Sequence, residues 1–173
     1  MAAGDVKIEY GTSTEFTLTN LHATAASSTL IAGWESNEID NTSNKYQDYL
    51  ISGLLKVAAA NAQIGKIEVH IVAMISDTVW PDVFDGTESE PETISSASRK
   101  AQICKLGASI DTTATNDAIY EFGPFTVASL FGGVMPPKVV VFITSDATSS
   151  GAAFAADMNI VTFQGVYHTV AAA

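Results

Sequence analysis

Polar and apolar residues alternate with a period of two along much of the chain. Residues 66–71 read Lys, Ile, Glu, Val, His and Ile, which is the pattern of a strand with one buried face. Residues 138–143 are a lysine followed by five apolar residues, which is typical of a strand covered on both sides. The same criteria predict strands at residues 6–10, 15–19, 29–34, 46–58, 66–76, 101–110, 119–122, 124–131, 138–144 and 158–170. The pattern therefore predicts an all-β protein.

The longest of these strands, residues 46–58, places Tyr49, Ile51, Leu55 and Val57 on one face. Gly53 interrupts the run, and we expect a β-bulge there. A helix over residues 46–62 is the alternative, because apolar residues also recur near helical spacing in this stretch. At the start of the chain, residues 6–10 and 15–19 flank a short turn-like segment and predict a β-hairpin.

Many short strands joined by loops of uneven length favour a jelly-roll-like sandwich of two sheets, with an open barrel as the alternative. The chain has neither an internal repeat nor a Pro/Ser-rich linker, so residues 1–173 are predicted to form a single β-sandwich domain. About the first 30 residues form either an arm or an added hairpin on it. The core is predicted from the strands with the strongest patterns, and it includes Val69, Ile71, Val127, Val141, Ile143 and Phe163.

The composition is apolar and acidic. Apolar residues make up 47% of the chain and charged residues only 16%, with a net charge of −11. Such a charge repels phosphate backbones and anionic lipids, so nucleic-acid and membrane binding are not expected. The uncharged surface that remains favours self-association as a homo-oligomer. The sequence also shows no signal-peptide pattern and no run near the length of a membrane span, which predicts synthesis in a cytoplasm.

Residues that could carry chemistry are scattered. His22, His70 and His168 are each isolated, without the His-x-His pair of a cupin-type metal site, and are interpreted as surface or hydrogen-bonded histidines. Cys104 is the single cysteine and is predicted to be a small buried side chain. No nucleophile elbow occurs. We therefore predict no catalytic residue, no metal and no cofactor, and a protein that is not an enzyme. A hydrolase with two carboxylates that meet only in the fold is the rival hypothesis.

A long loop is predicted at residues 77–98. It contains Trp80 and carries six acidic residues and no basic one between positions 77 and 92. These are Asp77, Asp82, Asp85, Glu88, Glu90 and Glu92. Long loops in compact domains are often functional. We interpret this one as a solvated acidic loop, with a calcium site or a docking surface as the alternatives.

Several segments carry a resemblance to a known family. They are residues 40–42 with 48–50, residues 79–86, residues 122–136 (Phe-Gly-Pro-Phe-Thr-Val-Ala-Ser-Leu-Phe-Gly-Gly-Val-Met-Pro) and residues 163–167 (Phe-Gln-Gly-Val-Tyr). Together they resemble a family of small virion proteins of tailed bacteriophages, encoded with the head genes and similar to capsid decoration, or cement, proteins. The resemblance spans roughly residues 30–168 and leaves the N-terminal segment without a role.

The resemblance implies a jelly-roll-like domain that binds the outer capsid lattice of a virion and stabilises the shell, with the major capsid protein as its partner. Trp34, Trp80 and Phe84 are the candidate interface residues, because large aromatic side chains dominate interface hot spots; closure of the sandwich core is the alternative for each. A second hypothesis is a glycan-binding or receptor-binding jelly roll of a virion, in which Trp34, Trp80 and Tyr46 would act as stacking platforms.

Overall fold

The computed structural model describes residues 5–58, 64–88, 91–113, 115–147 and 153–170. It confirms the all-β fold, because the strands form two antiparallel sheets that face each other as a sandwich. The first sheet has the order β1 (Val6–Tyr10), β11 (Ile160–Val170), β5 (Asp48–Lys56) and β9 (Ile119–Thr126), with β2 (Thr14–Glu15) also paired to β11. The second has the order β7 (Pro91–Thr93), β3 (Ala32–Glu35), β10 (Lys138–Ser145), β6 (Gly65–Ala73) and β8 (Cys104–Thr112), with β4 (Ile39–Asp40) also paired to β10.

The main core lies between the two sheets, as the period-two pattern predicts. Of the six predicted core residues, five are fully buried, and Phe163 is half-buried against the same cluster. The buried five are Val69, Ile71, Val127, Val141 and Ile143. Each such aliphatic side chain contributes roughly 1.5–3 kcal/mol through its removal from water.

Strand β5 occupies the position predicted for the longest strand and is not a helix. Tyr49, Ile51, Leu55 and Val57 are all fully buried, so the predicted apolar face is confirmed. The pairing with β9 shifts register between Ile51 and Gly53, but the extra residue lies on β9, because Phe125 and Phe122 oppose these two residues. Gly53 itself keeps regular register with β11, so the irregularity lies opposite the predicted position and not at Gly53. A Cβ on this glycine would lie 2.3 Å from the carbonyl oxygen of Ile160, so only glycine fits there. The alternative helix also included residues 59–62, which lie outside the described residues.

A second hydrophobic cluster covers the outer face of the second sheet. Val140 and Phe142 point to this side of β10, whereas Val139 and Val141 point into the main core. The predicted two-sided burial of this strand is thus confirmed. The cover comes from the segment after β6, which contributes Phe84 and Ile94, while Cys104 at the start of β8 belongs to the covered face. The segment predicted as a long loop is therefore a third layer packed on the sheet.

Two predicted strands are partly helical. α1 (Ala97–Ile103) replaces the start of the strand predicted at residues 101–110, and β8 begins only at Cys104. Ser96 starts this helix, because its side-chain oxygen accepts a hydrogen bond from the backbone N–H of Arg99. Likewise α2 (Val127–Leu130) interrupts the strand predicted at residues 124–131. A short 3₁₀ helix, η1 (Leu21–Ala23), lies in the N-terminal segment.

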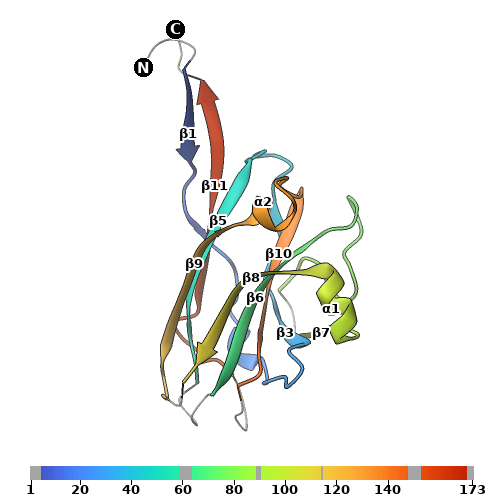
Figure 1. The fold of residues 1–173 in the computed structure, drawn as a ribbon, viewed down its shortest axis with the longest axis vertical. Coiled ribbons are helices and arrows are strands. Elements are labelled where there is room, and N and C mark those ends of the chain that lie inside the picture. The colour runs from blue at the N-terminus through green and yellow to red at the C-terminus, as the bar shows by residue number, and fades with distance from the viewer. Residues whose placement is uncertain (1–4, 59–63, 89–90, 114, 148–152, 171–173) are drawn as a thin grey trace.

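The N-terminal hairpin prediction is wrong. β1 and β2 do not pair with each other, because both pair antiparallel with β11, β1 with residues 166–170 and β2 with residues 162–163. β11 has 11 residues and is long enough to hold both. Figure 1 shows that β1 and the end of β11 project beyond the body of the sandwich as a two-stranded ribbon. We call this element, residues 6–10 with 166–170, the terminal ribbon.

Candidate interaction surface

Two of the three predicted interface residues lie inside the protein. Trp34 is only 2% exposed, and its indole Nε1 donates a hydrogen bond to Oε1 of Glu88 at 3.1 Å. Phe84 is 4% exposed and packs edge-on against Phe142, with ring centroids 5.1 Å apart. Side chains buried this way leave almost no area for a partner, so the structure gives no support to an interface role for Trp34 and Phe84. Both close hydrophobic clusters, which was the alternative for each.

The remaining predicted aromatics are half-buried. Trp80 packs against the second hydrophobic cluster, next to Gly86, where a Cβ would lie 3.0 Å from the indole Nε1. Tyr46 lies between Tyr49 and Tyr167, with ring centroids 5.5 and 5.6 Å away. Both side chains are therefore partly covered by the protein itself, which reduces the area that a sugar could contact.

Acidic residues of the segment 77–92 accept hydrogen bonds both locally along the chain and, at Glu88, from the body of the sandwich. Asp82 accepts hydrogen bonds from the backbone N–H and hydroxyl of Ser95, and Glu88 accepts one from the backbone N–H of Asn20 as well as the one from Trp34. Asp85 accepts one from the backbone N–H of Thr87. Within the described residues no group of three His, Cys, Asp or Glu side chains is placed to hold a metal ion. Glu90 lies outside the described residues.

The buried carboxyl group of Glu35 links the segment 77–92 to β3 by hydrogen bonds. Glu35 is 1% exposed, and its Oε1 accepts a hydrogen bond from the backbone N–H of Gly86 at 2.8 Å, while Oε2 lies 3.4 Å from the backbone nitrogen of Asp85. Burial raises the pKa of this carboxyl group from 4.5 to about 8. Nothing in the local sequence pattern signals this site, because Glu35 stands at the end of an otherwise apolar run.

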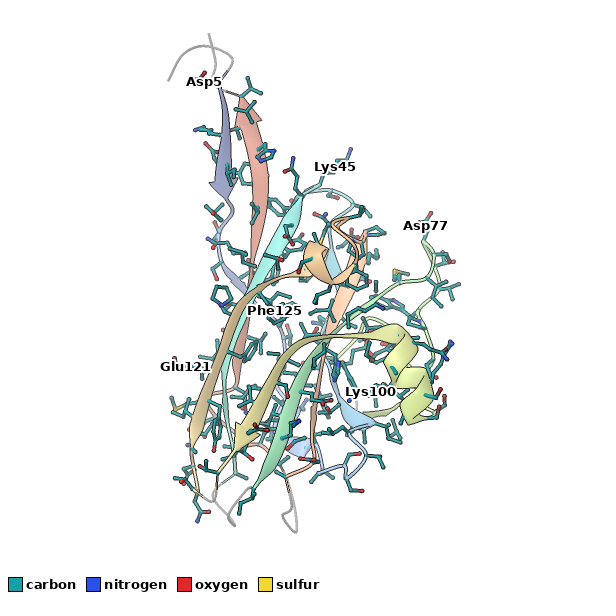
Figure 2. All side chains as sticks on the ribbon, in the orientation of Figure 1. Asp5, Lys45, Asp77, Lys100, Glu121 and Phe125 are labelled. Carbon is teal, nitrogen blue, oxygen red and sulfur yellow. The ribbon has the colours of Figure 1, made fainter. Side chains whose placement is uncertain are left out.

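A polar cluster also lies under α1. Nζ of Lys100 is 2.8 Å from Oε2 of Glu68 and donates to the carbonyl oxygen of Leu30 at 2.6 Å. The same Glu68 oxygen lies 3.0 Å from Nε2 of His70. Figure 2 labels Lys100 on the helix that covers this part of the sheet. The three side chains join the helix to β6 through a charged contact that is largely shielded from water.

His70 is a deeply buried histidine. Its side chain lies on the outer face of β6, is 5% exposed, and has Nδ1 without a hydrogen-bond partner. Burial, together with the positive charge of Lys100, lowers the pKa of His70 to about 4, against the effect of Glu68. The interpretation as a surface or hydrogen-bonded histidine is correct only for its Nε2 atom.

Cys104 is buried, as predicted, and packs in the second hydrophobic cluster. Burial raises the pKa of its thiol to about 12. The thiolate, which is the nucleophilic form, is therefore a negligible species at neutral pH.

The terminal ribbon carries the most unusual surface of the described chain. Val6, Ile8 and Tyr10 on β1 are 65%, 59% and 57% exposed. They lie directly opposite Val170, His168 and Val166 on β11, and directly opposed residues in an antiparallel pair project from the same face. One face of the ribbon is thus open and, apart from His168, apolar, whereas the other carries Lys7, Glu9, Tyr167 and Thr169. Figure 2 labels Asp5, where the ribbon begins.

A hollow of about 400 Å³ lies along residues 15–19, next to residues 156, 158 and 159. It is lined by Phe16, Leu18 and Met158 together with Glu15, Thr17, Thr19 and Asn159. Its single ionisable side chain is Glu15, so this lining offers no pair of groups for acid–base chemistry.

No family model, no curated protein and no solved structure matches this chain. In the part of the chain that the structure describes, no helix is long and apolar enough to cross a membrane.

Proposed function

We propose that this protein is a structural component of a tailed-bacteriophage virion that binds the outer capsid lattice as a decoration, or cement, protein. The observation that carries the proposal is the open apolar face of the terminal ribbon. The nature of the partner rests on the resemblance of residues 122–136 and 163–167, which form the end of β9, the short helix α2 with its following turn, and the middle of β11.

A projecting two-stranded ribbon with an apolar face is an element suited to contact. Two strands alone are marginally stable in water, and a contiguous exposed apolar patch on a folded protein usually marks an interaction site. The ribbon extends away from the sandwich (Figure 1), which would let it contact a partner surface ahead of the body. Docking on a protein lattice buries Val6, Ile8 and Tyr10 without rearranging the sandwich.

The charge of the chain favours the outer side of a DNA-filled shell. A net charge of −11 is repelled by packaged DNA. Many copies on one lattice need only modest affinity each, because linked sites raise the effective concentration of one another. In this proposal the protein contributes stability and no chemistry.

Glycan or receptor binding is the second candidate, and the structure favours it less. The aromatics expected to stack on sugars are buried at Trp34 and half-buried at Trp80 and Tyr46. Among the large exposed hydrophobic side chains of the described residues, Tyr10 is the aromatic one. It lies on the terminal ribbon, so a sugar site there would compete with capsid docking.

The test adds purified protein to capsids that lack it, and measures both bound protein and the temperature at which DNA is released. We expect binding and a higher release temperature. Ile8→Ser should weaken binding, whereas Ile75→Ser, which changes an equally exposed isoleucine in the loop near Asp77 (Figure 2), should not. No binding and an unchanged release temperature would refute the capsid role, and glycan-array binding by the same preparation would then favour the second candidate.

A further inference from the structure

We propose that the outer edge of β1 pairs with β1 of a second copy of this chain, antiparallel and about a two-fold axis at Ile8, so that the first sheets of two molecules join into one. This goes beyond capsid binding and does not depend on it, because the pairing involves the edge of the ribbon and needs no other partner.

The edge of β1 is open. β1 is the terminal strand of its sheet, and no described strand lies on its outer side. The backbone N–H of Gly11 donates to the carbonyl oxygen of Gly165 at 2.8 Å, and the carbonyl oxygen of Val166, opposite Tyr10, instead accepts from Gln47 on the β5 side. Hydrogen-bonded and non-hydrogen-bonded pairs alternate along an antiparallel ladder. The backbone groups of Val6, Ile8 and Tyr10 therefore point outward.

These outward groups match those of a second β1 strand. With Ile8 opposite Ile8 of the other copy, Val6 lies opposite Tyr10 and Tyr10 opposite Val6. All three of these pairs fall at outward-pointing positions, so each can exchange both backbone hydrogen bonds. The apolar side chains of both copies then project from one face, which doubles the apolar surface of the ribbon.

The charges of β1 are complementary in the same register. The strand reads Val-Lys-Ile-Glu-Tyr, so a two-fold axis at Ile8 places Lys7 of each copy opposite Glu9 of the other. A two-fold axis at Lys7 or at Glu9 would instead place two identical charges opposite each other, which is unfavourable. Of the outward positions, only Ile8 as the centre pairs all five residues of the strand. Charge and hydrogen bonding thus select one register.

Both charged side chains are available for this contact. Lys7 and Glu9 form an ion pair within the strand, and their side chains remain 40% and 30% exposed. The hydrogen bond from Lys7 lowers the pKa of Glu9, so Glu9 is negative at neutral pH. In the paired form each lysine lies between the glutamate of its own strand and that of the other copy.

An edge that carries alternating charges normally discourages uncontrolled pairing. Here the charges are arranged so that one antiparallel register gains two ion pairs, and the two-fold symmetry closes the assembly at a dimer. A five-residue strand makes a small interface, so we expect a dimer whose fraction rises with protein concentration.

The experiment uses the full chain with two single charge reversals, Lys7→Glu and Glu9→Lys, studied separately and mixed in equal amounts. Sedimentation velocity gives the dimer fraction, and native mass spectrometry identifies which chains have paired. The wild-type protein should dimerise, and each variant alone should dimerise about tenfold or more weakly, because each places two like-charged pairs across the axis. The mixture should form the heterodimer at wild-type strength.

The mixture separates pairing between chains from the ion pair within the strand. Each variant loses its internal pair of Lys7 with Glu9, and mixing does not restore it. The side chain introduced by Lys7→Glu and the one introduced by Glu9→Lys are on different chains, and they meet only across the proposed axis. Recovery in the mixture therefore reports the intermolecular contact alone, and circular dichroism of each variant checks that it is folded.

Two control variants make the same charge reversals far from β1. They are Lys105→Glu on β8 and Glu121→Lys on β9. We expect both to dimerise like the wild type. A wild-type protein that stays monomeric over the whole concentration range would overturn the proposal. So would single variants that dimerise as well as the wild type, or a mixture without the heterodimer. A dimer that nevertheless fails to bind capsids would refute the proposed function and leave this inference intact.

Discussion

Glu35→Gln is expected to remove a pH-dependent loss of stability. Glu35 is buried at the end of β3 and accepts the hydrogen bond from the backbone N–H of Gly86. Its pKa is raised from 4.5 to about 8 by burial, so the folded protein binds this proton more tightly than the unfolded chain does. The free energy of unfolding contributed by Glu35 is therefore greatest below pH 4.5, falls as the pH rises toward about 8, and is constant above that.

The raised pKa sets an upper limit for this effect. Each pH unit between the two pKa values costs at most about 1.4 kcal/mol of stability, so the whole interval from 4.5 to about 8 corresponds to at most about 5 kcal/mol. The N–H groups of Gly86 and Asp85 stabilise the carboxylate, and the pKa of about 8 already includes their effect. We therefore expect a loss of at most about 4 kcal/mol between pH 5 and pH 9. Glutamine keeps the acceptor for Gly86 and cannot ionise.

The assay is chemical denaturation of the wild-type protein and the variant over a series of pH values, with the difference in unfolding free energy plotted against pH. The contribution of His70 has the opposite sign and is common to both proteins, so it cancels in the difference. Glu35→Gln should gain stability relative to the wild type as the pH rises through this interval. Glu121→Gln, at an exposed position, controls for the loss of one negative charge. A difference between Glu35→Gln and the wild type that does not change with pH would show that the buried carboxyl group does not titrate as argued.

Three further predictions concern buried side chains. Ile71→Ala, between the two sheets, should lower the free energy of unfolding by about 2–5 kcal/mol; a loss below about 1 kcal/mol in urea denaturation would contradict its burial. His70→Gln should remove a loss of stability that the wild-type protein shows as the pH falls from 6.5 toward 4, because the folded state holds this imidazole neutral with its pKa lowered to about 4; an unchanged acid-unfolding profile would argue against it. Cys104, buried with its pKa raised to about 12, should react with a thiol reagent at pH 8 only after unfolding, and rapid modification of the native protein would refute this.

The sandwich core was predictable because period-two alternation reports burial directly. Ile67, Val69 and Ile71 follow one another on the same face of β6, and each is fully buried. The same local pattern does not report pairing partners. β1 pairs with β11, at the other end of the chain, and local sequence made the adjacent strand at residues 15–19 the simpler partner. Long-range pairing is set by the packing of the whole sheet, which a window of ten residues does not contain.

The third layer, which the segment 77–98 forms on the second sheet, is not indicated by the sequence for a different reason. Residues 77–98 contain Pro81, Gly86 and Pro91 and many acids, so their composition indicates a loop, and most of the segment is irregular. Its few apolar side chains, such as Phe84 and Ile94, still cover the outer face of the second sheet. The helix α1 did have a start signal in Ser96, whose side chain caps it, but seven residues are too few for a helical period to stand out.

Two of the three predicted interface residues, Trp34 and Phe84, are buried in the protein itself. Large aromatic side chains serve cores and interfaces equally well, because both gain from the burial of a large apolar area. Trp34 and Phe84 serve the core. Residue type alone therefore did not separate the two roles, and the covering layer that buries Phe84 was not foreseen.

The terminal ribbon shows what alternation means when the fold leaves one face open. Val6, Ile8 and Tyr10 have the same pattern as strands of the core, and that pattern predicted a half-buried strand, yet all three are more than half exposed. Alternation indicates that burying one face of a strand lowers the free energy of the system. It does not indicate which molecule covers that face. The sandwich covers such faces on β5 and β6 with its own chain. On β1 it does not, and the charges of Lys7 and Glu9 on the opposite face are arranged symmetrically about Ile8. The apolar face of β1 stays exposed, and the edge of the same strand carries self-complementary charges. Both features favour a second molecule as the partner that covers it.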